Sequence, residues 1–314
     1  MASGSLNGAW GRWPRRAAGA AILPLLLLSL GVTACTADAT ARREAAAALA
    51  VSAGMRPVTF DAGRFVLMGD LKGTGSGSPV LVVYIEGDGF AYVSRTQVSR
   101  DPTPRHPVGL ELAAADSSPA VLYLGRPCQY VAPAEARGCG TQYWSSHRFA
   151  PEVIDAVNHA IDQALVLVGT RRVLLIGYSG GGAVAALAAA RRSDVVAWAT
   201  VAAPLDHAAW TRWHGVSPLA GSLNPVDDAP RLAGLPQIHF TGANDDVVPP
   251  GIVRGFLERE GPGRDTVLMV IPGFTHECCW VARWPDLRSR IPPGTADAVP
   301  PVTAPAPTPT APGF

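Results

Sequence analysis

Short apolar runs alternate with helix-like segments along most of the chain. Pro151–Val168 has the apolar spacing of a helix and begins with proline, and Ala183–Arg191 is alanine-rich. Upstream, Val58–Phe60 and Phe65–Leu71 flank the turn Asp61-Ala62-Gly63, which predicts an antiparallel hairpin. The remaining runs have the length and composition of buried strands: Val80–Ile85, Val121–Leu124, Val173–Ile176, Val195–Val201, Ile238–Thr241 and Val267–Ile271. This alternation predicts an α/β fold, a mostly parallel sheet with helices on both faces.

One of the predicted strands leads directly into a glycine-rich turn that carries a serine. Val173–Ile176 is followed by Gly177-Tyr178-Ser179-Gly180-Gly181, and a helix comes next. A serine on a tight turn between a strand and a helix is the sequence form of a nucleophile elbow. Gly177 and Gly181 suit this turn, because a Cβ would clash where strand and helix pack closely. The helix N-terminus behind Ser179 would favour developing negative charge.

The same glycines have a second interpretation. Gly177, Gly180 and Gly182 could cradle a pyrophosphate at a strand-to-helix turn. That motif usually lies on the first strand of a βαβ unit, and an acidic residue ends the next strand. Here the turn lies past the middle of the chain, and the next strand ends in Ala202-Ala203-Pro204; Asp206 comes later, in a loop. These features favour the nucleophile.

Two later strands end in loops that carry the partners a serine nucleophile needs. Ile238–Thr241 is followed by a loop containing Asp245, and Val267–Ile271 by a loop containing His276. Because parallel strands end at one edge of a sheet, we expect both side chains to meet Ser179 there. His276 would take the serine proton, and Asp245 would orient the imidazole. Asp246 is the alternative acid, whereas His276 is the only histidine after position 239.

These motifs, in the order serine, acid, histidine, resemble the α/β-hydrolase family of esterases and lipases. The resemblance covers roughly residues 57–290, and Gly242 to Pro249 has the family's acid-loop form, Gly-x-x-Asp-x-x-Val-Pro. It implies an α/β-hydrolase fold with at most a small cap region. It also implies a cofactor-independent serine hydrolase that acts through an acyl-enzyme. The sequence contains no metal-ligand spacing.

The resemblance also assigns an oxyanion hole made of two backbone N–H groups. One belongs to the residue after the nucleophile, Gly180. The other lies in the loop Glu86-Gly87-Asp88-Gly89, which resembles the family's His-Gly-x motif with Glu86 in place of histidine. This alignment assigns the Asp88 N–H as the second donor, with the Gly89 N–H as the alternative.

The N-terminus has the pattern of an export signal. Arg12, Arg15 and Arg16 precede the uncharged apolar stretch Ala17–Val32, which is too short and wrongly flanked for a membrane span. Small residues directly before Cys35 resemble a bacterial lipoprotein box, which implies cleavage before this cysteine and its acylation. An ordinary secreted protein cleaved near Ala34 is the alternative.

We therefore expect four regions: a signal peptide (1–34), a lipidated cysteine and spacer (35–56), a hydrolase domain (57–290) and a disordered tail rich in Pro, Ala and Thr (291–314). The expected location is the bacterial cell envelope, with the membrane as partner through Cys35. Charge is balanced, with 26 Lys+Arg against 25 Asp+Glu, and there is no basic stripe, so nucleic-acid binding is not expected.

Four cysteines remain in this oxidising setting and are expected to pair. Cys128 could pair with Cys139 and Cys278 with Cys279, or each of the last two could pair with one of the first two. A Cys128–Cys139 bridge would be worth about 3 kcal/mol in loop entropy. The sequence does not choose among the three connectivities.

The substrate is the least determined feature. Trp210, Trp213 and His214 could line a pocket or pack at the surface, and the same holds for Tyr143–Arg148. Arg148 could bind an anionic substrate group or form a structural ion pair. A small-molecule carboxylic ester is the expected substrate, although thioesterases, peptidases and acyltransferases share these motifs. The hypothesis from another class is a non-catalytic envelope lipoprotein that uses the fold as a binding or scaffold surface.

Overall fold

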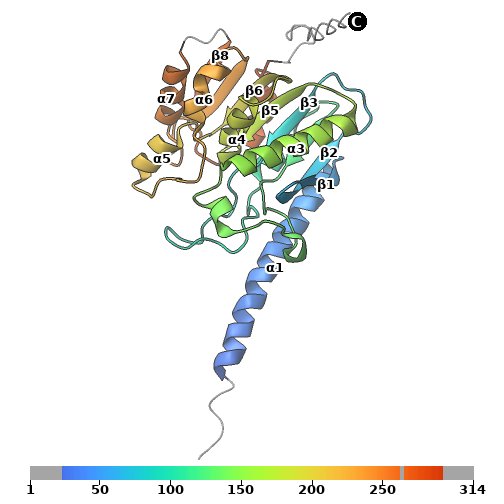
Figure 1. The fold of residues 1–314 in the computed structure, drawn as a ribbon, viewed down its shortest axis with the longest axis vertical. Coiled ribbons are helices and arrows are strands. Elements are labelled where there is room, and N and C mark those ends of the chain that lie inside the picture. The colour runs from blue at the N-terminus through green and yellow to red at the C-terminus, as the bar shows by residue number, and fades with distance from the viewer. Residues whose placement is uncertain (1–22, 262–264, 293–314) are drawn as a thin grey trace, which may run out of the picture. The chain divides into compact units, whose positions relative to one another are not determined.

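An eight-stranded mixed sheet organises the structure, a computed structural model that describes residues 23–261 and 265–292 (Figure 1). The strand order is β1-β2-β4-β3-β5-β6-β7-β8. β2 pairs antiparallel with both β1 and β4, and the other neighbours are parallel. The strands are β1 Arg56–Ala62, β2 Phe65–Lys72, β3 Leu81–Ile85, β4 Val121–Leu124, β5 Val173–Tyr178, β6 Val195–Val201, β7 Gln237–Gly242 and β8 Thr266–Ile271. The mostly parallel sheet and the opening hairpin are thus confirmed.

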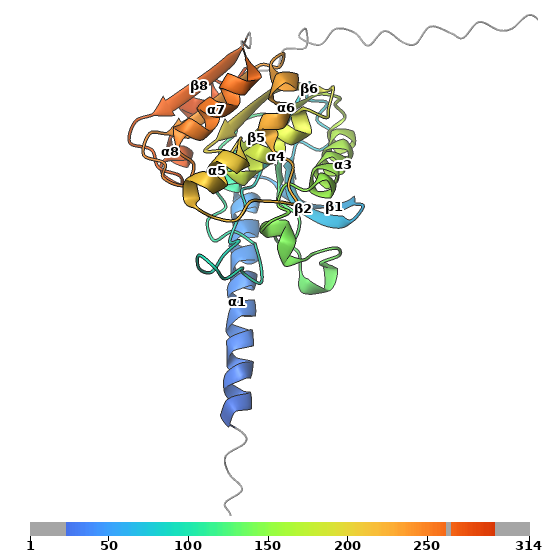
Figure 2. The same ribbon diagram turned by 60° about the vertical axis from the view of Figure 1, so that its left-hand side comes forward.

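Helices cover both faces of this sheet (Figures 1 and 2). One core cluster joins α3, α4, α6 and α7 to strand residues such as Val83 and Leu175. The other joins α2 and α8 to the alternate residues, such as Tyr84 and Ile176. Strand side chains alternate between faces, so both central strands are buried on both sides. The helices are α2 Val108–Ala114, α3 Pro151–Val168, α4 Gly180–Ala189, α5 His207–His214, α6 Pro225–Leu232, α7 Pro250–Glu260 and α8 Trp280–Arg288.

Several of these helices carry weak or misleading signals in the sequence. α6 and α8 contain Pro230 and Pro285, which ordinarily argue against a helix interior. α5 is short, but it is framed by an Asp206 carboxylate that caps its N-terminus and by left-handed Gly215 at its C-terminus. α4 begins at Gly180, three residues before the predicted start, because the glycines of the turn already belong to the helix.

The first helix, α1 (Leu23–Ser52), contains Cys35. From Arg42 onward the chain belongs to one compact unit. Ala46 and Ala50 of its last turns are buried in the core, and Arg43 pairs with Asp101 at 3.0 Å. Residues that the sequence assigned to a spacer are therefore packed, because alanine side chains let the helix backbone approach its neighbours closely. In the described part of the chain, no helix has both the length and the apolarity to cross a membrane.

Other sequence predictions fall outside the described residues. Residues 1–22 of the predicted signal peptide and 293–314 of the predicted tail are among them. The side chain of Cys35, the predicted lipidation site, is also outside the described part.

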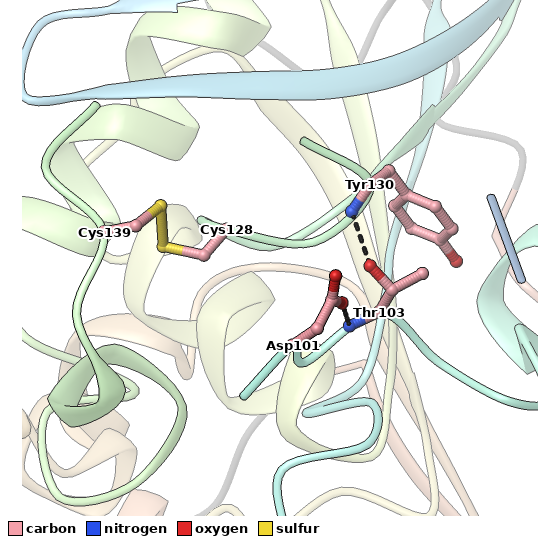
Figure 3. The surroundings of a disulfide bond; sticks show 5 residues. All are labelled: Asp101, Thr103, Cys128, Tyr130 and Cys139. Atoms are coloured by element: carbon pink, nitrogen blue, oxygen red, sulfur yellow. Dashed lines mark hydrogen bonds between the residues drawn. A yellow bond between two sulfur atoms is a disulfide. The ribbon is translucent and has the colours of Figure 1, made fainter. Parts of the chain in front are cut away.

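Two disulfides join the four cysteines after Cys35 as Cys128–Cys139 and Cys278–Cys279. The first closes a loop between two cysteines that are 11 positions apart, beside the turn at Thr103 shown in Figure 3. The Thr103 hydroxyl accepts a hydrogen bond from the Tyr130 amide at 2.9 Å, and the Thr103 amide donates to the Asp101 carboxylate at 2.8 Å. This region therefore combines a covalent link with local hydrogen bonds.

Replacement of Cys128 and Cys139 by alanine should lower the free energy of unfolding by about 3 kcal/mol, because the unfolded chain regains loop entropy. Urea denaturation under oxidising conditions measures this. The matched variant Cys278→Ala/Cys279→Ala keeps the Cys128–Cys139 loop closed, so its free energy of unfolding should fall by less than half as much. A smaller loss in the first variant than in the second would contradict the loop-closure explanation.

Candidate active site

Three loops at the carboxyl ends of β5, β7 and β8 bring Ser179, Asp245 and His276 together. The Ser179 Oγ lies 3.0 Å from His276 Nε2, and His276 Nδ1 lies 2.9 Å from Asp245 Oδ2. The Asp245 side chain is fully buried, whereas Asp246 is exposed and is not part of this chain of contacts. The three side chains therefore form one chain of contacts in the order serine, histidine, carboxylate, the arrangement predicted for a nucleophile, its base and an orienting acid.

The turn that carries Ser179 is as tight as the sequence suggested. Ser179 has φ 51° and ψ −125°, a conformation that non-glycine residues rarely adopt, and its amide donates to Val201 O at 2.8 Å. A Cβ on Gly177 would lie 2.2 Å from Gly181 O, and one on Gly181 would lie 2.1 Å from Ile85 O. Neither glycine can be replaced without moving the backbone. The hydroxyl is therefore held at the N-terminus of α4.

The acid and the base are each held by further hydrogen bonds. Asp245 Oδ1 accepts from the amides of Val247 and Val248 at 2.9 and 2.7 Å. The His276 carbonyl accepts from Trp280 Nε1 at 2.8 Å and from the Tyr178 hydroxyl at 3.2 Å. These contacts limit movement of the backbone at His276 and of the Asp245 side chain. Trp280 is not among the site residues predicted from the sequence, although it lies only four residues after His276.

The two residues assigned to the oxyanion hole lie side by side. Gly180 is the first residue of α4, whose opening N–H groups lack intrahelical acceptors. No hydrogen bond of the described residues uses the Asp88 N–H. A Cβ on Gly180 would lie 2.1 Å from Asp88 Oδ1, so this loop packs directly on the start of the helix. Both N–H groups are available near Ser179.

The Asp88 carboxylate is neutralised by two buried guanidinium groups. Arg148 donates to one carboxylate oxygen, and Arg126 donates to the other at 3.3 Å. Burial alone would raise the pKa of Asp88, but the two cations outweigh it and lower that pKa. Arg148 is therefore an ion-pair partner as well as a wall of the cavity. Nothing in the sequence pointed to Arg126, which lies far from Asp88 along the chain.

Glu86, which stands where the resembling family has histidine, is buried and forms no salt bridge with a described residue. It accepts hydrogen bonds from the amides of Gly87, Gly109 and Leu110 and from the Tyr123 hydroxyl. Burial raises the pKa of Glu86 to about 6, although these donors act in the opposite direction. Glu86 therefore ties residues 86–89, called the oxyanion loop below after their predicted role, to the N-terminus of α2.

A cavity of about 420 Å³ opens in front of Ser179. Its walls come from the oxyanion loop, the loop before α2, the segment before α3, and α5. Trp210 lines the cavity and donates to Val247 O at 2.7 Å, whereas Trp213 is mostly exposed. His214 also contacts Val247 O, at 2.8 Å. Among the described residues, no cluster of His, Cys, Asp and Glu is arranged to hold a metal ion.

The raised pKa of Glu86 generates a pH-dependent prediction. Between about pH 4.5 and 6 the folded protein binds more protons at Glu86 than the unfolded chain does. As the pH rises through this window, the free energy of unfolding of the wild type should fall by about 2 kcal/mol relative to that of Glu86→Gln, whose glutamine side chain does not titrate. Urea denaturation of both proteins from pH 4.5 to 7.5 measures the difference.

Burial also raises the pKa of Asp70 to about 6. Asp70 is present in both proteins, so its contribution to the pH dependence cancels in the comparison. A pH-independent difference would contradict this account.

No protein-family model and no curated protein matches this chain. Solved structures are similar at low identity. Est1E from Butyrivibrio proteoclasticus is 15% identical, with a TM-score of 0.51, over 74% of this chain and 98% of that one. An esterase from Pyrococcus furiosus is 15% identical, with a TM-score of 0.52, over 76% and 90%. An acylaminoacyl peptidase from Pyrococcus horikoshii is 14% identical, with a TM-score of 0.55, over 74% of this chain but 39% of the peptidase. At such identities the similarity concerns the fold, and this chain has the α/β-hydrolase fold.

Proposed function

We propose that the protein is a serine hydrolase that cleaves small carboxylic esters. The observation that carries the proposal is the continuous contact from Ser179 through His276 to buried Asp245, open to a cavity of about 420 Å³. The similar structures include esterases and a peptidase, so they support a hydrolase without separating these activities. The walls formed by Phe90, Phe149, Trp210 and Leu219 suit an apolar acyl or alcohol group.

The proposed reaction proceeds in two steps. Ser179 Oγ attacks the ester carbonyl carbon while His276 Nε2 takes its proton, and the Gly180 and Asp88 N–H groups stabilise the oxyanion. The C–O bond to the alcohol breaks as His276 gives the proton to the leaving oxygen. Water then attacks the acyl-enzyme, His276 takes a proton from it, and the carboxylic acid leaves as Ser179 regains its proton. No cofactor takes part in either step.

Substitution of Ser179 or His276 should abolish activity while leaving the fold intact. Ser179→Ala and His276→Ala should each lower kcat for p-nitrophenyl butyrate by about 10⁴-fold or more, since the serine and its base act as a unit. Both variants should also lose labelling by a fluorophosphonate probe.

Ser193→Ala and His159→Ala change exposed residues outside the cavity lining and serve as matched controls. Both should retain labelling and turnover. A folded wild-type protein that neither labels nor hydrolyses any ester would overturn the proposal and favour the non-catalytic envelope lipoprotein. Faster cleavage of a peptide amide than of the matched ester would favour a peptidase.

The proposal includes a location at the bacterial cell envelope, with a lipid anchor at Cys35. The arginine-flanked apolar stretch and the small residues before Cys35 support export and acylation. The two disulfides support an oxidising compartment. A membrane anchor would hold the hydrolase near ester substrates outside the cytoplasm.

Cys35→Ser tests the anchor. In a bacterial host, the full-length protein should incorporate labelled palmitate and sediment with membranes, and the variant should do neither because it has no thiol to acylate. Thr36→Ala, which changes the next residue, should behave like the wild type. Equal incorporation by Cys35→Ser and wild type would refute acylation at this position.

A further inference from the structure

One arginine at the cavity has neither a hydrogen-bond acceptor nor an ion-pair partner among the described residues. Arg105, in the loop before α2, is exposed and lines the cavity together with Ser179 and His276. Within the described part of the chain, its side chain has neither an ion pair nor a hydrogen bond. We propose that Arg105 binds a carboxylate on the substrate, so that the preferred esters carry one carboxylate besides the ester group. This inference rests on the proposed hydrolase function and specifies its substrate class.

The loop that carries Arg105 is held in place before any ligand binds. Pro102, Thr103 and Pro104 are buried, and Thr103 is fixed by the hydrogen bonds to Tyr130 and Asp101 shown in Figure 3. The Phe90 amide donates to Pro102 O at 3.0 Å, which joins this loop to the oxyanion loop. A rigid loop loses little conformational entropy on binding. Arg105 is therefore presented in a defined position relative to the reaction centre.

The guanidinium itself is positioned by an aromatic face. It lies 3.8 Å from the centroid of the Phe90 ring, and Arg42 lies over the same ring at 5.4 Å. Stacking on a ring occupies the plane of a guanidinium and leaves its N–H edge free to donate to a carboxylate. Arg42 donates to Thr103 O, whereas no described residue accepts a hydrogen bond from Arg105. A carboxylate can accept two parallel hydrogen bonds from that edge.

The other charges at the cavity decide which anion fits. Asp88 is neutralised by Arg126 and Arg148, and buried Glu86 is occupied by its four donors. Glu277, next to His276, is exposed and keeps a negative charge at the cavity. Because Arg105 and Glu277 line the same cavity with opposite charges, a monoanionic carboxylate is favoured over a dianionic phosphate. Glu277 should therefore weaken anion binding, and its neutralisation should strengthen it.

Matched pairs of esters test the inference. Mono-p-nitrophenyl glutarate, which carries a free carboxylate on the acyl side, is compared with its methyl ester. 4-Acetoxybenzoate, which carries a free carboxylate on the alcohol side, is compared with its methyl ester. In at least one pair the ratio of kcat/KM, acid over methyl ester, should be about tenfold lower in Arg105→Gln than in wild type. The same ratio should rise in Glu277→Gln, and in wild type it should shrink when salt is raised from 0.05 to 0.5 M.

Arg254→Gln is the matched control, because Arg254 is an exposed arginine on α7 outside the cavity lining, and it should keep the wild-type ratio. Circular dichroism checks that Arg105→Gln is folded. Ratios in Arg105→Gln equal to wild type for both pairs would overturn the inference while leaving ester hydrolysis in place.

A second readout does not depend on turnover. Monomethyl glutarate should bind to Ser179→Ala at least fivefold more tightly than to Ser179→Ala/Arg105→Gln in isothermal titration calorimetry. Equal or undetectable binding to both proteins overturns the carboxylate site. Absence of labelling and hydrolysis in wild type, together with Arg105-dependent binding, overturns only the hydrolase.

Discussion

The close approach of β5 to α4 is the constraint on which the rest of the structure depends. Backbone atoms of Gly181 and Ile85 occupy the space where side chains on Gly177 and Gly181 would stand, and Ala203 does the same at Gly182. This packing fixes the positive-φ conformation of Ser179 and holds its hydroxyl at the edge where β7 and β8 also end. The histidine and the carboxylate need only short loops to reach it. Backbone strain at a functional residue persists because surrounding packing over-determines it.

The oxyanion loop is stabilised by two buried carboxylates, one that is ion-paired and one that accepts hydrogen bonds only from neutral groups. Asp88 is kept charged by two guanidinium groups, whose attraction outweighs the cost of burial. Glu86 receives only neutral donors, and its pKa rises. The first arrangement links the loop to the segment before α3 through Arg148, and the second links it to α2. Two independent sets of contacts therefore hold this loop against the start of α4.

The histidine loop is held in a comparable way. Thr275 and Cys278 hydrogen-bond to each other through backbone and hydroxyl groups at 2.8 and 3.2 Å, directly around His276. Trp280 then anchors the His276 carbonyl from the first residue of α8. His276 is thus carried by a compact turn between β8 and α8, whose Trp280, Trp284 and Leu287 are buried. Its imidazole can accept and return a proton without a large change in position.

The sequence by itself determined the strands, the long helix α3, the elbow and the order of Ser179, Asp245 and His276. These features depend on local patterns: apolar periodicity, glycine spacing and the tendency of parallel strands to end at one edge. Only the tertiary structure decided which cysteines pair, that Arg126 neutralises Asp88, and that the end of α1 belongs to the core. It also decided that Arg105 stacks on Phe90 at the cavity. The disulfides join cysteines that are close in sequence, but their spacing alone left three connectivities open. The other contacts join different segments of the chain, and no local propensity records which segments the fold brings together.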